Sequence, residues 1–164
     1  MVRRGPDTTK LIEVEGYFFM HNLLSITGKF TPQPFVEEEP EVVVMYNGEI
    51  YNAEELTVKY LEGVDLHTSS DTEVLYEILR KYGVSILQEV DGMFAFVFYD
   101  GEKVIASRDR MGIKPLFVGA VESKLVFSSE LSIILENLHP TVNEELIPEF
   151  IKYKYVGPQS TIYK

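Results

Sequence analysis

The 164 residues are enough for one domain with a substantial core, and 45% hydrophobic residues fit a globular protein rather than a disordered one. A net charge of −11 argues against binding to nucleic acid, whose phosphates would repel it. There is no cysteine, which excludes disulfides and thiol nucleophiles within these residues, and the three histidines lack metal-motif spacing, so we predict no metal site. No apolar run is long enough for a membrane span, residues 1–6 do not resemble a signal peptide, and a cytoplasmic location is expected.

Seven segments of the chain have the apolar or β-branched composition of strands. They are residues 11–14, 17–23, 42–46, 93–99, 104–107, 115–121 and 125–128. Turn residues at Glu15-Gly16, at Asp100-Gly101 and at 122–124 join six of them in pairs, so three antiparallel hairpins are expected. The remaining run, residues 42–46, is apolar throughout, which is typical of a strand covered on both faces.

Helices are predicted between and after these strands. They cover residues 53–61, 74–82, 129–135 and 143–153. Asn52 can cap the first, and Ser70-Asp71-Thr72-Glu73 has the capping-box spacing for the second. Hairpins with helices between and after them predict an α+β fold. The domain is assigned to residues 1–152, and residues 153–164, which lose the periodicity, to a linker.

Asn47 and Gly48 directly follow the apolar run, within the stretch YNGEIYN. Asn-Gly is the strongest short signal for a type I′ hairpin turn. An Asn amide beside an exposed Gly N–H is also one way to build an oxyanion hole. The pair alone favours the turn, and its surroundings must decide between the two interpretations.

Seven short motifs follow one another along the chain, and their order and spacing matter more than any one of them. They are RGPDTT from Arg4, HNLLSITG from His21, YNGEIYN from Tyr46, SSDTEVL from Ser69, DGMFAFVFYD from Asp91, SRDRMGIKPLF from Ser107 and FSSEL from Phe127. Together they resemble the class II glutamine amidotransferase domain of asparagine synthetases over essentially the whole chain. The resemblance implies an N-terminal-nucleophile hydrolase fold, an αββα sandwich of two antiparallel sheets.

The resemblance also implies a reaction and its site. An N-terminal cysteine attacks the side-chain amide of glutamine, a thioester forms, and the released ammonia serves an ATP- and magnesium-using synthetase domain that amidates aspartate. The matched positions are Asn47 and Gly48 for the oxyanion hole, and Ile26, Thr27, Glu49 and Asp71 for glutamine binding. Asp71 would hold the α-ammonium group, and helix capping is a compatible alternative for it. These matches tilt Asn47-Gly48 toward the oxyanion hole.

The sequence departs from the family pattern in two places. The family begins Cys-Gly-Ile, with a strand and a helix before the RGPD motif, and these 164 residues contain neither. An arginine that pairs with the α-carboxylate of glutamine is replaced by Leu23, which would weaken binding by roughly 2 to 5 kcal/mol. Neighbouring Asn22 offers only one weaker hydrogen bond. For Arg108 and Asp109 we favour a structural role as a buried ion pair.

Three functional hypotheses follow. The chain is the glutaminase part of an asparagine-synthetase-like enzyme, inactive in isolation, which requires a complementing N-terminal segment and a synthetase domain that holds ATP and magnesium. Alternatively it is a non-catalytic binding or scaffolding module that retains the fold. A third, weaker hypothesis is a hydrolase with another nucleophile. Strands left without a neighbour also predict self-association.

Overall fold

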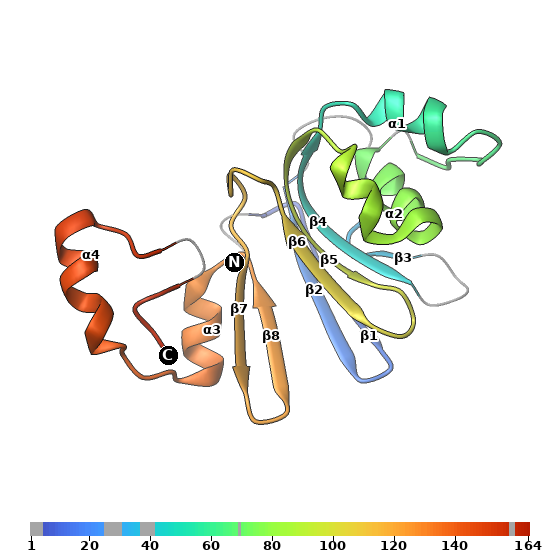
Figure 1. Cartoon of the computed structure of the whole chain (residues 1–164). Helices are drawn as coiled ribbons and strands as arrows, with labels where there is room; N and C mark the ends of the chain where they lie inside the picture. The colour runs from blue at the N-terminus through green and yellow to red at the C-terminus, as the bar shows by residue number, and fades with distance from the viewer. Residues whose placement is uncertain (1–4, 25–30, 37–41, 69, 158–159) are drawn as a thin grey trace. The chain divides into compact units, whose positions relative to one another are not determined.

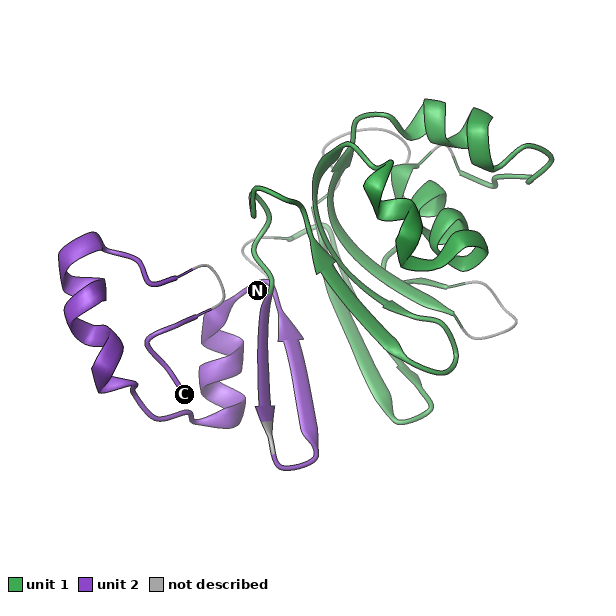
Figure 2. Ribbon diagram, in the orientation of Figure 1, with its two compact units in different colours: residues 1–116 green, residues 117–164 purple. Residues whose placement is uncertain are grey.

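The computed structural model describes residues 5–24, 31–36, 42–68, 70–157 and 160–164 (Figure 1). It divides the chain into two compact units, residues 1–116 and residues 117–164 (Figure 2). Each unit is described by itself.

Within the residues described, the larger unit contains two antiparallel sheets. The four-stranded sheet has the order β3-β4-β5-β6, with the bounds Phe35–Val36, Val43–Ile50, Gly92–Tyr99 and Val104–Arg108. A hairpin of β1 (Thr8–Val14) and β2 (Tyr17–Leu23) forms the other sheet, and its register places Val14 opposite Tyr17. The predicted turn at Glu15-Gly16 is therefore confirmed.

The strand β5 is covered on both faces. On one face the ring of Phe98 packs against Tyr76 of the helix α2 (Asp71–Tyr82), with ring centroids 6.4 Å apart. On the other face Tyr99 packs against Tyr17 and Phe19 of the β1–β2 hairpin, at 5.1 and 6.2 Å. Because successive side chains of a strand point to opposite faces, α2 and the hairpin lie on opposite sides of the sheet (Figure 1).

The helix α2 begins with the predicted N-cap. Ser70 Oγ accepts the Thr72 N–H at 3.0 Å. The second half of the predicted capping box is wrong, because the buried carboxylate of Glu73 accepts the N–H groups of His67 and Thr68 at 2.7 and 2.6 Å instead. Glu73 therefore fastens the loop before α2 to the core.

The helix α1 (Ala53–Tyr60) also begins where the sequence predicts, but without a side-chain cap. The Asn52 amide donates to the Glu89 carbonyl at 2.9 Å and accepts the Asp91 N–H at 3.0 Å. Asn52 thus connects the start of α1 with the segment before β5. The 3-10 helix η1 (Gly83–Gln88), which leads into that segment, had no sequence signal of its own.

The smaller unit is a hairpin followed by helices. Its elements are β7 (Phe117–Val121), β8 (Lys124–Ser128), α3 (Leu131–Leu138), the 3-10 helix η2 (Glu144–Leu146) and α4 (Ile147–Tyr153). An added Cβ at Gly119 would lie 2.5 Å from Leu138 and 2.6 Å from Ile134. The helix α3 therefore packs directly on the backbone of β7. Near the C-terminus, Val142 and Tyr163 form an antiparallel bridge.

These elements confirm the α+β class with antiparallel sheets. The helix predicted at 143–153 is a 3-10 turn that continues into α4, with Pro148 in its first turn. The division into a domain over 1–152 and a linker over 153–164 stays a prediction. In the described ranges, every helix is too short or too polar to cross a membrane.

Candidate functional site

Asn47 and Gly48 lie inside strand β4, so the hairpin-turn interpretation is wrong. The strand continues to Ile50 and pairs Asn47 with Ala95 and Gly48 with Phe94 of β5. An added Cβ at Gly48 would lie 2.2 Å from the Met93 carbonyl oxygen and 2.7 Å from the Phe94 Cα. Glycine is required here because any side chain would push the two strands apart.

The N–H of Gly48 points to the outer edge of β4, away from β5. Its partner Phe94 uses both backbone groups on the far side, donating to Asp109 Oδ2 at 3.2 Å and accepting the Asp109 N–H at 2.7 Å. In an antiparallel pair, Gly48 is then a non-hydrogen-bonded partner with its N–H outward. Strand β3 pairs only with Val43 and Val44, so it does not cover this part of the edge.

The backbone N–H groups of every second residue of β4, at Tyr46, Gly48 and Ile50, point to this edge. Two of the three have side-chain acceptors. The Tyr46 N–H donates to Gln33 Oε1 at 2.7 Å, and the Ile50 N–H donates to Asp71 Oδ2 at 2.9 Å. Between them, the Gly48 N–H has no acceptor among the residues that the structure describes. The adjacent Asn47 amide likewise makes no hydrogen bond to a described residue. The edge therefore presents unused donors at the position predicted for the oxyanion hole.

The carboxylate of Asp71 reaches this edge from the first turn of α2. Its Oδ2 accepts two hydrogen bonds, from the Tyr46 hydroxyl at 2.6 Å and from the Ile50 N–H at 2.9 Å. The alternative of helix capping by Asp71 is not what the structure shows, since Ser70 is the N-cap. Burial, together with the charge of Asp71, raises the pKa of Tyr46 well above its usual value, so its hydroxyl stays a donor.

Asp71 and the Gly48 N–H lie close together along β4. The Ile50 N–H that binds Asp71 is two residues from Gly48, or roughly 7 Å along a strand. Strand alternation places the side chains of Asn47 and Glu49 on the face toward the β1–β2 hairpin. The structure thus brings four of the six predicted residues to one stretch of edge. Ile26 and Thr27 lie outside the described residues.

Leu23 is a buried apolar residue at the end of β2, only 9% exposed, on the same face as buried Phe19. Neighbouring Asn22 points to the opposite face, where its Oδ1 accepts the Thr9 hydroxyl at 2.7 Å. Asn22 is therefore not placed to substitute for the family arginine.

Asp109 is structural, but not as part of a buried ion pair with Arg108. Its side chain is buried, whereas Arg108 is exposed. The carboxylate accepts four backbone N–H groups, from Phe94, Met111, Ile113 and Lys114, at 2.9 to 3.2 Å. Burial alone would raise the pKa of Asp109, but these backbone donors outweigh it and hold the pKa below its usual value.

Sequence patterns did not indicate the roles of two residues at this edge. Gln33 is separated from its partner by 13 residues and Tyr46 by 25. Neither spacing belongs to a helix or a turn, so only the fold brings these groups together. The Gln33 side chain substitutes for a neighbouring strand at the Tyr46 N–H.

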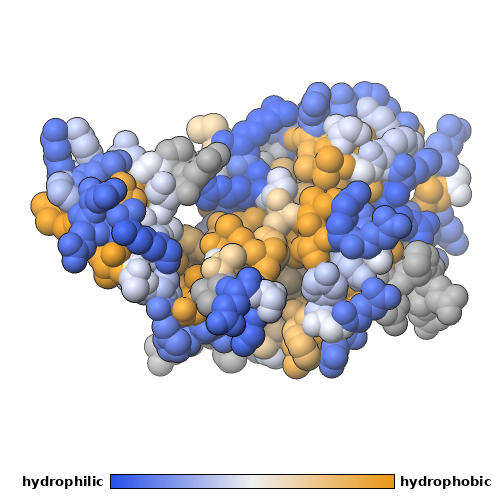
Figure 3. Space-filling view, turned by 60° about the horizontal axis from the view of Figure 1, so that its bottom comes forward, coloured by the Kyte–Doolittle hydropathy of each residue, from blue (hydrophilic) through white to orange (hydrophobic). Residues whose placement is uncertain are grey.

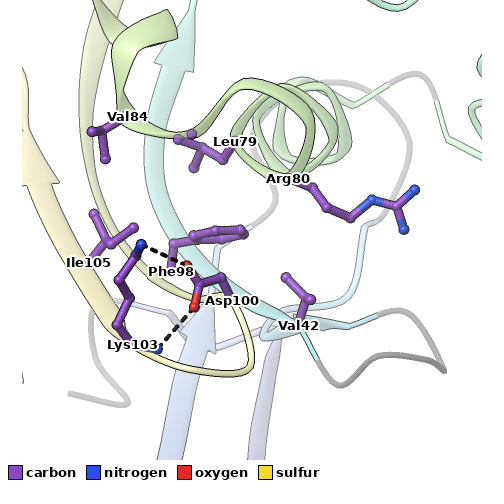
Figure 4. Close-up of a pocket in the computed structure, with 9 residues that line it drawn as sticks. Val42, Leu79, Arg80, Val84, Phe98, Asp100, Lys103 and Ile105 are labelled. Atoms are coloured by element: carbon purple, nitrogen blue, oxygen red, sulfur yellow. Dashed lines mark hydrogen bonds and ion pairs between the residues drawn. The ribbon is translucent and has the colours of Figure 1, made fainter.

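A cavity of about 260 Å³ lies elsewhere in the larger unit, between the end of α2 and the β5–β6 turn (Figure 4). Val42, Leu79 and Phe98 form its apolar wall, and none of the predicted site residues lines it. Its charged residues are paired, Lys103 with Asp100 at 3.6 Å and Arg80 with Glu77 at 3.6 Å. The described part of the chain also holds no group of three or more His, Cys, Asp or Glu residues arranged to bind a metal.

Comparisons with known proteins identify the family of this chain. A family model described as a glutamine amidotransferase domain matches residues 1–164. The chain is 38% identical over 138 residues to "Asparagine synthetase [glutamine-hydrolyzing]" of Zea mays, covering 82% of this chain and 23% of that protein. It is 34% identical over 139 residues to "Asparagine synthetase B [glutamine-hydrolyzing]" of Escherichia coli, covering 82% and 25%.

A solved structure shares the fold. Glutamine phosphoribosylpyrophosphate amidotransferase from B. subtilis, complexed with ADP and GMP, is 26% identical with a TM-score of 0.59, over 73% of this chain and 29% of that one. The chain spans about a quarter of the length of the two asparagine synthetases. It belongs to the class II glutamine amidotransferase family, with an N-terminal-nucleophile hydrolase fold of the asparagine synthetase type.

Proposed function

We propose that this chain is the glutamine-binding part of a glutamine-dependent asparagine-synthetase-like enzyme. The reaction converts glutamine into glutamate and ammonia, and the ammonia amidates aspartate in a separate synthetase part. The observation that carries the proposal is the edge of β4, where an open Gly48 N–H lies two residues from the N–H that binds Asp71. An anion and an open oxygen-binding donor at this spacing suit an amino acid whose side chain ends in a carbonyl group.

In this proposal the chain binds and polarises the substrate. Asp71 holds the α-ammonium group of glutamine, and the Gly48 N–H and the Asn47 amide bind the carboxamide oxygen. Attack at the carboxamide carbon leaves negative charge on that oxygen, which fixed donors stabilise without reorganisation. Ile26, Thr27 and Glu49 line the remainder of the substrate site.

The nucleophile must come from outside these residues, because they contain no cysteine. A thiol adds to the carboxamide carbon, ammonia leaves with the proton that the thiol gives up, and water then hydrolyses the thioester to glutamate. We therefore expect this chain alone to be inactive. ATP and magnesium would act only in the synthetase part, and a complementing segment and that synthetase part are the proposed partners.

The first test is a titration of the ¹⁵N-labelled chain with L-glutamine, followed by NMR. We expect the largest shifts at the amides of Gly48 and Ile50, with no glutamate produced. A synthetic segment of the family type that begins Cys-Gly-Ile should then restore turnover, and Asn47→Ala should abolish it. Absence of glutamine binding, or turnover by the chain alone, would contradict the proposal.

Leu23 favours the second candidate function, a non-catalytic module that retains the fold. Its buried aliphatic side chain offers no charge to the α-carboxylate of glutamine. The same add-back experiment separates the two functions. If the segment forms a folded complex with the chain and no glutamate appears, the non-catalytic module is supported.

We also propose self-association through the outer face of the β1–β2 hairpin. Leu11, Phe18 and Met20 lie on this face and are 60, 68 and 45% exposed. The space-filling view in Figure 3 also shows hydrophobic residues at the surface on the face that it draws. Light scattering should show oligomers that Phe18→Glu dissociates, with Tyr51→Glu as an exposed control. A monomeric unaltered chain would contradict this.

A further inference from the structure

The hydroxyl of Tyr46 is hydrogen-bonded to the Asp71 carboxylate at the candidate site. Tyr46 is a core residue, 3% exposed, yet its hydroxyl leaves the apolar cluster to donate to Asp71 Oδ2 at 2.6 Å. A phenylalanine would fill the same apolar space. The hydroxyl therefore has a purpose that packing alone does not explain.

Two donors fix the orientation of the Asp71 carboxylate. The Tyr46 hydroxyl and the Ile50 N–H both bind Oδ2, and they come from the same strand. Hydrogen bonds to an ionised acceptor are short and strong, so together they hold the carboxylate against rotation. The other oxygen, Oδ1, accepts no hydrogen bond from the residues whose positions are described.

The Tyr46 hydroxyl is suited to this task at any physiological pH. Its burial and the nearby charge of Asp71 raise its pKa, so it remains protonated and donates. A neutral donor also leaves the negative charge of Asp71 in place for a ligand, which a lysine or arginine at this position would neutralise.

From this geometry we propose that Tyr46 is a positioning residue for ammonium recognition: by occupying Asp71 Oδ2, it leaves Oδ1 as the oxygen that receives the α-ammonium group of the substrate. This inference rests on the proposed function. Tyr46 does not touch the substrate and acts through Asp71. It thereby sets the preference for glutamine over carboxamides that lack an α-amine.

The test compares two ligands and two tyrosine variants by NMR titration of the whole chain. The ligands are L-glutamine and glutaramic acid, which has the same carboxamide and carboxylate but no amine. Tyr46→Phe should weaken glutamine binding about ten-fold and leave glutaramic acid binding unchanged. The matched control is Tyr99→Phe, since Tyr99 is equally buried and donates to the carboxylate of Glu15, and it should change neither.

Each outcome separates the two proposals. If the unaltered chain binds glutamine and Tyr46→Phe weakens both ligands equally, or weakens neither, the positioning role is overturned while the proposed function stands. If the unaltered chain binds no glutamine, both are overturned. Asp71→Asn should remove the preference for glutamine, and adding Tyr46→Phe to it should cause no further loss. A further loss of glutamine affinity would place Tyr46 in direct contact with the ligand, against the proposal.

Discussion

The start of α2 and the turn after β6 each hold an aspartate whose carboxylate accepts hydrogen bonds, but the two carboxylates are occupied differently. At the turn, both oxygens of Asp109 are occupied, Oδ1 by Met111 and Ile113 and Oδ2 by Phe94 and Lys114. At the start of α2, both donors bind Oδ2 of Asp71. The saturated carboxylate shapes the backbone, whereas the half-occupied one leaves an oxygen that, in our proposal, binds the ligand.

Burial matches this difference. Asp109 is 5% exposed, and a carboxylate at that depth must be fully hydrogen-bonded to remain charged. Asp71 is only partly buried, so an oxygen without a protein donor still reaches solvent. Hydrogen-bond saturation therefore distinguishes Asp109, which supports the framework, from Asp71, which we propose as a ligand-binding acid.

Asp109→Asn tests the framework role of Asp109 most directly. The new amide turns a donor toward one pair of N–H groups that Asp109 accepts, so we expect the free energy of unfolding to fall by about 3 kcal/mol. Urea denaturation followed by circular dichroism measures it. A loss below about 1 kcal/mol would show that the four amide contacts do not hold the turn.

Asp71→Asn should have the opposite profile. The amide oxygen can still accept from Tyr46 and Ile50, so the free energy of unfolding should change by less than about 1 kcal/mol. The outward atom becomes an NH₂ group that repels an ammonium group, and glutamine affinity should fall about 30-fold, or about 2 kcal/mol. NMR titration measures the affinity. A stability loss as large as that of Asp109→Asn would abolish the distinction.

The sequence predicted the elements around both aspartates from local signals. Alternating apolar residues and turn pairs located the strands, and the Ser70 cap and apolar period located α2. Asn47-Gly48 shows the limit of local sequence patterns. The pair is typical of a turn, yet it lies within a strand, where glycine is required because the Met93 carbonyl approaches so closely. The family motifs favoured the oxyanion hole over the turn at this pair, whereas the turn propensity of Asn-Gly favoured the wrong interpretation.

The hydrogen bonds of the two carboxylates could not be predicted in the same way. Asp71 meets its partners across 21 and 25 residues, a separation with no sequence pattern. Asp109 meets three of its donors within five residues, yet the neighbouring charge of Arg108 suggested an ion pair instead. Backbone N–H groups make these contacts, and residue types do not show which N–H groups a turn directs toward a side chain.

Acid pH tests how much the charge of Asp109 contributes to stability. The pKa of Asp109 in the folded chain lies below its ordinary value of 3.8, so its charge stabilises the fold above that pH. As the pH falls through the folded pKa, this stabilisation is lost. The stability difference between the unaltered chain and Asp109→Asn should therefore narrow below about pH 4. The effect is smaller than that of the substitution, since the hydroxyl oxygen of protonated Asp109 can still accept a hydrogen bond, whereas the NH₂ group of asparagine cannot.

The control for this experiment is the same pair of measurements on Asp71→Asn. Urea denaturation at several pH values gives the free energy of unfolding of each variant relative to the unaltered chain, under identical conditions. A difference for Asp109→Asn that stays constant from neutral pH to pH 2 would mean that charge contributes nothing at the turn.

Ser70→Ala removes the N-cap of α2 and leaves Asp71 intact. Loss of the cap should lower the free energy of unfolding by about 1 kcal/mol. If Tyr46 and Ile50 orient Asp71, glutamine affinity should change by less than about two-fold, because neither donor belongs to the helix. Ser85→Ala, at an exposed serine that donates to the Tyr82 carbonyl, is the matched control. An affinity loss approaching that of Asp71→Asn would assign the orientation of Asp71 to the helix start rather than to β4.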